Sequence, residues 1–403
     1  MKYAGEYFSH YACFKPMCKV FLVFHFYSCE VNSMKLKVEG RARIKILALV
    51  CAVSLLPTVF RSINNRQANI SATRMVIDVA GRRVLIPEHV ERIACLTGAS
   101  YEKAFLVGAG NRIAMRASSG PPWMVRTNPS VQQIPLMHNS HNPNVEDLLK
   151  QNVQVVFFWD SPRGLDKLAR SGMVAVIPQP ERIVSTSIRD FNEKMKSEVR
   201  LYGKVLGGDA SRKADIWSSY YDQKTHYVME RTQRIPEASR LKVYYLRGPS
   251  SLNTLGNNEN ITWYGEMAGA NMVIRNSRTN NIAKVSIEEI LQWNPDVVFV
   301  GRQYSPDLVL KDAKWRDISA IRNRRVYVIP DGVFYWDSSS EGVLLTEYMA
   351  QKLYPDLFKD LKMKDEVQTY YKQFYHYELT DNEADNMLHG LGPDGQRKNH
   401  FNN

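Results

Sequence analysis

Cysteine is scarce in this 403-residue chain, and most of it lies near the N-terminus. Cys13, Cys18, Cys29 and Cys51 lie in the first 73 residues, which leaves Cys95 as the one cysteine of the body that follows. A single cysteine forms no internal disulfide and supplies no cysteine-based zinc site. The body is therefore compatible with an oxidising compartment, although its composition does not require one.

Sequence signatures of common enzymes are also missing. The chain contains no Gly-x-Ser-x-Gly, Walker loop, dinucleotide-binding fingerprint or His-Glu-x-x-His motif. We therefore expect no enzymatic activity and no resident cofactor. A metal-dependent oxidoreductase subunit of two-lobed build is the rival enzyme class, but it needs paired cysteines or clustered histidines that the body does not offer.

Positive charge is in excess, at +12, but it is unevenly placed. The first 73 residues hold ten Lys/Arg against three Asp/Glu, so the other 330 residues carry only +5. Basic and acidic residues alternate in the body, without the dense basic stripe typical of phosphate-backbone contacts. We expect no nucleic-acid partner.

No apolar run reaches the roughly 20 residues that a membrane-spanning helix needs. The longest, at residues 46–60, follows a basic segment that contains Lys35, Lys37, Arg41, Arg43 and Lys45. This order predicts a secretory signal peptide and a mature chain that begins between residues 61 and 75. A retained membrane anchor is the alternative, and Met34 is an alternative start of the protein.

The body contains an internal repeat. Residues 144–158 and 286–300 lie 142 positions apart and share six of fifteen residues. Each copy predicts a short helix capped by Asn144 or Ser286, with acidic residues in its first turn, and then a fully apolar strand of a buried parallel sheet. A second apolar strand follows each copy, at residues 173–178 and 325–330. The pattern predicts two α/β lobes of similar build.

The segment between the repeats is different in kind. Phe191, Met195, Val199 and Tyr202 recur at helical spacing, and the Gly-Gly pair at 207–208 ends that helix. A second, longer helix capped by Asp209 follows. No Gly/Ser-rich linker is present, so we expect a stiff connection with a small hinge motion.

These observations give a complete division of the chain. We predict a leader over residues 1–73, an N-terminal lobe over 74–186, linking helices that include one long bridging helix over 187–235, a C-terminal lobe over 236–375 and a C-terminal extension over 376–403. The fold class is α/β, with mostly parallel sheets in both lobes and a ligand cleft between them.

Several motifs carry a resemblance to a known family. They are the predicted hairpin at 75–87 with Asp78 and Gly81, then Leu106-Val-Gly108, Leu206-Gly-Gly208, Ala268-Gly-Ala-Asn271 and Asn294-Pro-Asp296. Their order resembles that of periplasmic binding proteins for iron–siderophores and vitamin B12. The resemblance covers roughly residues 74–360 and implies a periplasmic, monomeric protein that captures a small-molecule metal chelate and delivers it to the membrane subunits of an ABC importer.

Two acidic residues gain a role from this resemblance. In relatives, one glutamate in each lobe meets arginines of the importer, and Glu146 and Glu288 match those positions. Both are also the identical acids of the internal repeat. Helix capping is the alternative role, since any acidic residue in a first turn interacts favourably with the helix dipole.

Ligand-binding candidates follow from strand-end geometry, because ligands of two-lobed α/β proteins sit at the carboxyl ends of strands. Rings cover the apolar face of a chelate, and guanidinium groups pair with its anionic oxygens. The aromatic and arginine residues expected in these loops are Arg116, Trp123, Trp159, Arg247, Tyr264, Tyr335 and Trp336. For each of them, core packing is the alternative.

The sequence does not identify the metal or the ligand. His138 and His141 lie three residues apart and are candidates for direct metal contact, but no third ligand lies near them in sequence, and a polar surface loop is the alternative. We expect a ferric siderophore as the ligand. Cobalamin, haem, a nickel chelate and molybdate are compatible with the same cleft.

Overall fold

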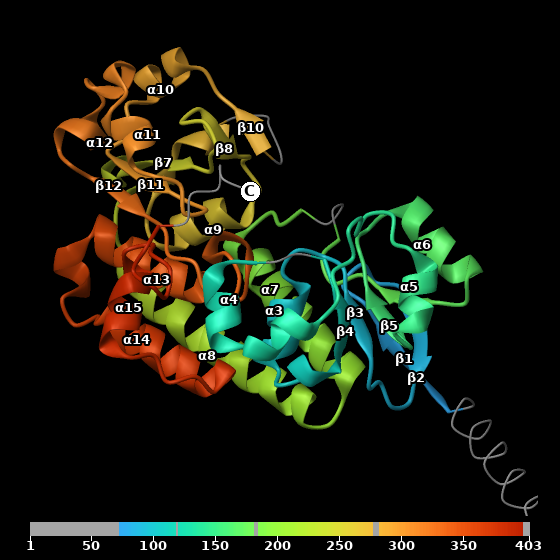
Figure 1. Ribbon diagram of the computed structural model, residues 1–403. Coiled ribbons are helices and arrows are strands. Elements are labelled where there is room, and N and C mark those ends of the chain that lie inside the picture. Colours follow the sequence, from blue (N-terminus) through green and yellow to red (C-terminus); the bar gives the residue numbers. More distant parts are fainter. Residues whose placement is uncertain (1–71, 118–119, 181–183, 277–281, 398–403) are drawn as a thin grey trace, which may run out of the picture. The chain divides into compact units, whose positions relative to one another are not determined.

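The computed structural model describes residues 72–117, 120–180, 184–276 and 282–397. The predicted leader, with its signal peptide and alternative start, lies outside these residues except for its last two positions. The described residues all belong to one compact unit of the chain (Figure 1).

The N-terminal lobe contains a four-stranded parallel sheet in the order β4-β3-β5-β6. The strands are β3 (Ile93–Cys95), β4 (Ile113–Arg116), β5 (Val155–Phe157) and β6 (Val174–Val176). The helices of the lobe are α3 (Ser100–Leu106), α4 (Pro122–Thr127), α5 (Val145–Lys150) and α6 (Pro162–Arg170). The apolar run at the end of the first repeat copy thus forms a buried parallel strand, as predicted.

A hairpin precedes this sheet. Strands β1 (Thr73–Ile77) and β2 (Arg83–Pro87) pair in antiparallel register, with Met75 opposite Leu85. Gly81 adopts a φ of 79° in the turn, a conformation that costs a glycine nothing. The hairpin predicted from sequence is confirmed.

The C-terminal lobe repeats the arrangement. Its parallel sheet has the order β12-β11-β7-β9, built from β7 (Lys242–Leu246), β9 (Asn271–Met272), β11 (Val297–Val300) and β12 (Val326–Val328). Strands β8 (Asn253–Leu255) and β10 (Ile282–Lys284) form a separate antiparallel pair. The helices are α9 (Asn260–Met267), α10 (Ile287–Trp293), α11 (Asp307–Leu310) and α12 (Ser319–Arg322).

Two antiparallel helices link the lobes, α7 (Ile188–Leu206) and α8 (Asp209–Thr232). Ser187 caps α7 through the amide of Asp190, and Gly207 and Gly208 turn the chain with φ values of 68° and 54°. The predicted cap of the second helix was wrong by one residue. Gly208 occupies the cap position, and the Asp209 side chain in the first turn pairs with Arg212 instead.

The C-terminal region adds three helices, α13 (Gly342–Leu353), α14 (Met363–Tyr370) and α15 (Asp381–Leu388). Thr380 and Glu383 form a capping box at the start of α15. Glu383 also pairs with Arg126 of α4 at 2.7 Å, and Trp123 Nε1 donates to the Leu391 carbonyl at 2.9 Å. The predicted extension therefore contacts the N-terminal lobe through α4.

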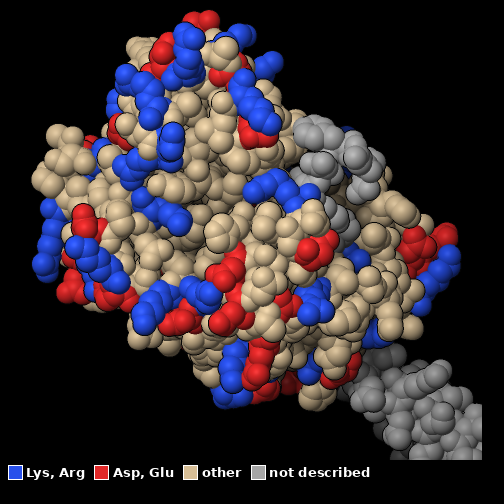
Figure 2. Space-filling view, turned by 60° about the vertical axis from the view of Figure 1, so that its left-hand side comes forward, with Lys and Arg blue, Asp and Glu red and all other residues tan. Residues whose placement is uncertain are grey.

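Charged residues of both signs share the surface. On the face shown in Figure 2, lysines and arginines are interspersed with aspartates and glutamates. Many charged side chains of the described residues form local ion pairs, such as Arg170 with Asp166 at 2.7 Å and Lys311 with Asp307 at 2.7 Å. Exposed pairs of this kind contribute little to stability.

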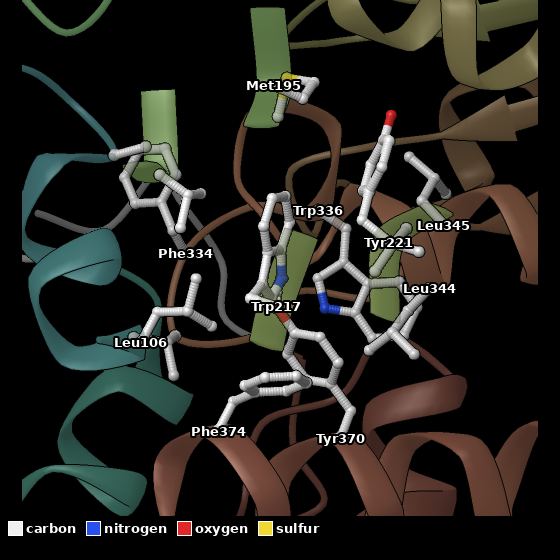
Figure 3. Close-up of a cluster of buried hydrophobic side chains, with 14 of the residues drawn as sticks. Leu106, Met195, Trp217, Tyr221, Phe334, Trp336, Leu344, Leu345, Tyr370 and Phe374 are labelled. Atoms are coloured by element: carbon white, nitrogen blue, oxygen red, sulfur yellow. Dashed lines mark hydrogen bonds between the residues drawn. The ribbon is translucent and has the colours of Figure 1, made fainter. Parts of the chain in front are cut away.

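Successive side chains of the central strands point to opposite faces of each sheet, so the core is divided into separate clusters. Ile93, Cys95, Val243 and Tyr245 belong to one large cluster that also takes in the apolar faces of α7, α8 and α13. The opposite faces of the two sheets pack against smaller clusters under α5–α6 and α10–α12. Aromatic rings dominate the large cluster, where Trp217 Nε1 donates to the Tyr370 hydroxyl at 3.1 Å (Figure 3). The inner faces of both sheets and the linking helices thus share one core.

Candidate functional site

A cavity of about 610 Å³ lies at the carboxyl ends of strands from both lobes. Gly98 and Ala99 follow β3, Trp159 follows β5, and Gln179 follows β6. The C-terminal lobe contributes residues 258–260 at the start of α9, Arg302 after β11, and Phe334 and Ser338 after β12. Lys194 and Glu198 of α7 complete the polar lining. The predicted strand-end geometry thus produces a cavity lined by both lobes.

Trp159 forms part of the wall on the side of the N-terminal lobe. Its ring stacks on His141 with centroids 4.6 Å apart and planes 10° apart. The indole Nε1 is buried and donates a hydrogen bond to none of the described residues. Trp159 therefore presents both a ring and an unused hydrogen-bond donor near the cavity.

Arg302 lies on the wall contributed by the C-terminal lobe, with a left-handed φ of 58°. Its Nε donates to Asp337 at 2.8 Å, and its guanidinium lies 4.0 Å above the centre of the Tyr335 ring. Although burial acts in the opposite direction, the Arg302 guanidinium lowers the pKa of Asp337. Strained backbone of this kind at a cavity wall is typical of functional positions. The contacts hold the guanidinium in one orientation.

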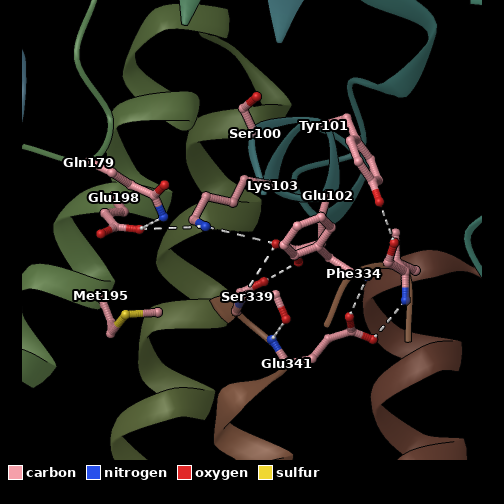
Figure 4. Close-up of polar contacts among 12 residues, drawn as sticks. Ser100, Tyr101, Glu102, Lys103, Gln179, Met195, Glu198, Phe334, Ser339 and Glu341 are labelled. Carbon is pink, nitrogen blue, oxygen red and sulfur yellow. Dashed lines mark hydrogen bonds and ion pairs between the residues drawn. The ribbon is translucent and has the colours of Figure 1, made fainter. Parts of the chain in front are cut away.

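Glu198 lies at the side of the cavity that α7 forms, and a buried polar network continues from it (Figure 4). Gln179 Nε2 donates to Glu198 Oε2 at 3.1 Å, and Lys103 Nζ lies 3.5 Å from the same oxygen. Lys103 also lies 3.9 Å from Glu102. One ammonium group therefore stands between two carboxylates.

Glu102 joins the N-terminal lobe to the C-terminal part of the chain, and Glu341 lies next to this contact. Glu102 of α3 accepts hydrogen bonds from Ser340 Oγ and, at 2.7 Å, from the Tyr375 hydroxyl. Glu341 accepts from the amides of Val333 and Phe334 at 3.2 and 3.0 Å. Burial, and then the nearby Glu102, raise the pKa of Glu341. The loop that carries Phe334 is therefore held by the buried carboxyl group of Glu341.

The predicted ligand-binding residues divide between the cavity and the core. Trp159 lines the cavity, and Tyr335 lies beneath the cavity residue Arg302. Trp123, Tyr264 and Trp336 are fully buried in the large core cluster, as the core-packing alternative stated. Tyr264 donates to the Ser339 carbonyl at 3.2 Å. Aromatic residues in these loops thus pack inward as well as toward the cavity.

The two predicted arginines also differ from each other. Arg116 is buried at the end of β4, where its Nε donates to the Val131 carbonyl at 3.3 Å and burial lowers its pKa. Arg247 is half-buried after β7, and neither arginine is among the residues that line the cavity. Their part in ligand binding stays a prediction.

The predicted docking glutamates occupy equivalent places. Glu146 lies in the first turn of α5 and Glu288 in the first turn of α10, and both are exposed. The caps are Asn144, which accepts from the Glu146 amide, and Ser286, which forms a capping box with Glu289. Neither glutamate carboxylate is the cap. Their side chains are accessible to a partner.

His138 and His141 are both exposed. Over the ranges that the structure describes, no group of three or more His, Cys, Asp or Glu side chains is placed to hold a metal ion. His141 instead stacks on Trp159. The direct metal site that these histidines suggested stays a prediction.

Lys194, Glu198, Arg302 and Phe334 line the cavity but were not among the residues selected from sequence. Arg302 follows the apolar strand of the second repeat copy. Its equivalent after the first copy is Asp160. The rule that ligands bind at the carboxyl ends of strands could therefore have identified Arg302 and Phe334 from the sequence. Lys194 and Glu198 belong to a helix, so no strand-end signal exists for them.

No helix within the described residues is long and apolar enough to cross a membrane.

Comparison with known proteins gives consistent matches. A family described as periplasmic binding protein matches residues 93–333. The molybdate-binding protein MolA of Haemophilus influenzae is 25% identical over 326 residues, which cover 75% of this chain and 91% of MolA. A periplasmic solute binding protein from Veillonella parvula shares 26% identity at a TM-score of 0.67, over 79% of this chain and 97% of that one.

A further structure, Helicobacter pylori CeuE in a Ni–His complex, aligns at a TM-score of 0.63 with 19% identity, over 79% of this chain and 99% of CeuE. At that identity the match shows the fold alone. The family match runs from β3 to the residues beyond β12, so it includes both parallel sheets and the linking helices. This chain therefore belongs to the periplasmic binding protein family, which confirms the resemblance inferred from its sequence motifs.

Proposed function

We propose that this protein is the solute-binding component of an ABC importer and that it captures a metal chelate, such as a ferric siderophore, in the cavity at the strand ends. The observation that carries this proposal is the cavity itself. Its volume of about 610 Å³ falls within the range of sites for drug-sized ligands, and loops of both lobes line it. A ligand held there contacts both lobes at once.

Residues of the cavity wall can contact both the apolar surface of a chelate and its anionic oxygens. The rings of Trp159 and Phe334 come from different lobes and offer apolar surface. Arg302 and Lys194 offer positive charge to the anionic oxygens that surround a bound metal. We keep Tyr335 as a proposed contact, since its ring lies under the guanidinium of Arg302, and Arg247 because it follows the carboxyl end of β7.

Molybdate is a second candidate ligand. The observation that favours it is the 25% identity to a molybdate-binding protein across most of both chains. A tetrahedral oxyanion is much smaller than the cavity, however, and it leaves the aromatic wall unused. We therefore place a chelate with an organic ligand first.

The test begins with the protein purified from the periplasm and with the metal content and native mass of whatever is bound to it. Calorimetric titration with a ferric hydroxamate, a ferric catecholate, nickel with histidine, and molybdate then compares the candidate classes. Trp159→Ala should weaken the binding of the preferred ligand by about 1–3 kcal/mol, because it removes a ring contact. Trp293→Ala, on α10 and outside the cavity, is the matched control.

The outcome separates the candidates. The proposal is supported if the protein binds one of the organic chelates most tightly and if Trp159→Ala weakens that binding. Preference for molybdate favours the second candidate, and equal affinity of Trp159→Ala and Trp293→Ala for every ligand shows that binding occurs elsewhere.

A further inference from the structure

Glu198 is a deeply buried carboxylate that nevertheless forms part of the cavity lining. Its side chain is only 1% exposed, and it projects from the third turn of α7. Gln179 and Lys103 both approach one of its oxygens, Oε2. In the part of the chain that the structure describes, no hydrogen bond reaches the other oxygen, Oε1. A buried carboxylate with an unused acceptor at a cavity is poised to meet a ligand.

The charge around Glu198 is not balanced by the protein. Lys103 is 1% exposed and lies between Glu198 and Glu102, at 3.5 and 3.9 Å. Its Nζ makes no hydrogen bond to any described residue. Glu102 already accepts bonds from Ser340 and Tyr375, which are neutral. Two carboxylates therefore share one ammonium group, and the cavity side of this cluster is formally negative.

Among the described residues, the other basic side chains of the lining form no ion pair with Glu198. Arg302 belongs to the opposite wall, where Asp337 binds it at 2.8 Å and Ser338 accepts from it as well. Lys194 is half-buried, and no ion pair joins it to Glu198 in the described ranges. Within the described residues, Glu198 thus shares Lys103 with Glu102, whereas Arg302 has Asp337 as its own counter-charge.

We propose that Glu198 contacts the ligand and determines its chemical class, by accepting a hydrogen bond from an N–H, O–H or ammonium group on the chelate. This inference rests on the proposed function, and it narrows the ligand to a chelate whose organic part carries donors near one end. A bare metal oxyanion is excluded from this contact, because it offers acceptors only.

The physical reason is the asymmetry between hydrogen-bond donors and acceptors at a buried carboxylate. An ionised carboxylate accepts hydrogen bonds and donates none. A donor from the ligand makes a charge-assisted bond, which is about twice as strong as a neutral one. An oxyanion at the same place faces like charge, and repulsion is stronger in a cavity than in bulk water. Gln179 and Lys103 hold the carboxylate in place for this selection.

Glu198→Gln tests the inference, since it keeps the shape of the side chain and removes its charge. We expect the variant to bind a donor-bearing chelate about tenfold to hundredfold more weakly, the range for a hydrogen bond to a charged group. The probes are a ferric hydroxamate with amide N–H groups, nickel with histidine, and molybdate, each titrated by calorimetry. The same change should leave molybdate affinity unaltered or raise it.

Glu193→Gln is the matched control, because Glu193 lies on the same helix, is exposed and faces Lys196 instead of the cavity. We expect it to bind every probe as the unaltered protein does. Glu198→Asp retains the charge, so it should keep the preference for donor-bearing probes even if each binds more weakly. This second variant decides the question if Glu198→Gln does not fold.

Three results would overturn the inference. The first is unchanged chelate affinity in Glu198→Gln, and if Trp159→Ala still weakens binding in the same titrations, the proposed function stands without it. The second is an equal loss for molybdate and for the chelates. The third is that no probe binds the unaltered protein, in which case the proposed ligand class and the inference fall together.

Discussion

At the scale of single residues, burial raises the pKa of carboxyl groups in this protein. Glu347 of α13 is fully buried, and neither of its oxygens has a hydrogen-bond partner among the described residues. Lys224 lies 3.6 Å away and also pairs with Glu366. Burial raises the pKa of Glu347 to about 8, although Lys224 opposes the shift. In the folded protein, Glu347 therefore stays protonated and neutral up to about pH 8.

This shift predicts a pH dependence of stability. The unfolded chain releases the Glu347 proton near its ordinary pKa of 4.5, whereas the folded protein retains it up to about pH 8. Stability contributed by the neutral group is thus complete below pH 4.5 and is lost as the pH rises toward 8. Glu347→Gln removes the titration, so we expect the variant to gain on the order of 1–3 kcal/mol over the unaltered protein between pH 5 and pH 9.

Urea unfolding at both pH values measures this difference. Glu237→Gln, at an exposed position, is the control and should show no pH-dependent gain. Parallel stability curves for Glu347→Gln and the unaltered protein across this range would show that Glu347 does not titrate as its burial implies.

At the scale of elements, a glycine permits the close approach of α7 and α8. A Cβ added to Gly203 would lie 2.8 Å from the Ala214 Cβ and 2.9 Å from the Ser211 Cα. Both neighbours are rigid, because one is a short side chain and the other is backbone. The antiparallel packing of the linking helices therefore depends on a residue without a side chain.

We predict that Gly203→Ala lowers the free energy of unfolding by about 1–3 kcal/mol, since the helices must separate to admit the methyl group. The better helix propensity of alanine offsets about 0.5–1 kcal/mol of this. Lys204→Ala, one position along and exposed, places an alanine on the same helix without the clash and with a smaller gain in helix propensity. Thermal unfolding of the two variants provides the measurement, and equal melting temperatures would contradict the predicted steric role.

At the scale of the whole molecule, Glu146 and Glu288 offer a test of the docking proposal. Both are exposed in the first turns of equivalent helices, and neither lines the cavity. We expect Glu146→Arg or Glu288→Arg to leave ligand affinity unchanged and to impair uptake, because charge reversal repels a basic partner surface. Binding by calorimetry and uptake of the labelled ligand in cells give the two readouts.

Asp356→Arg is the control for charge reversal alone, since Asp356 is exposed in a different region, before α14. It should affect neither readout. A loss of ligand affinity in Glu146→Arg or Glu288→Arg that matches the loss of uptake would remove the docking assignment.

The sequence by itself determined the two lobes, their parallel strands and the helix pair between them. Each of these depends on a pattern of nearby residues, such as the apolar run at Val297–Val300 or the glycines that separate α7 from α8. The repeat also located Glu146 and Glu288 correctly at helix starts, because caps and first turns are set by local backbone hydrogen bonds.

Only the tertiary structure decided which side chains meet at the cavity. Trp123 and Trp159 both follow strands, yet one donates to the Leu391 carbonyl in the core while the other lines the cavity. Glu198 and Lys103 lie 95 positions apart, and nothing in either neighbourhood indicates their contact. The physical reason is that local patterns fix where a strand or helix ends, whereas the direction of a side chain depends on which distant element packs against it.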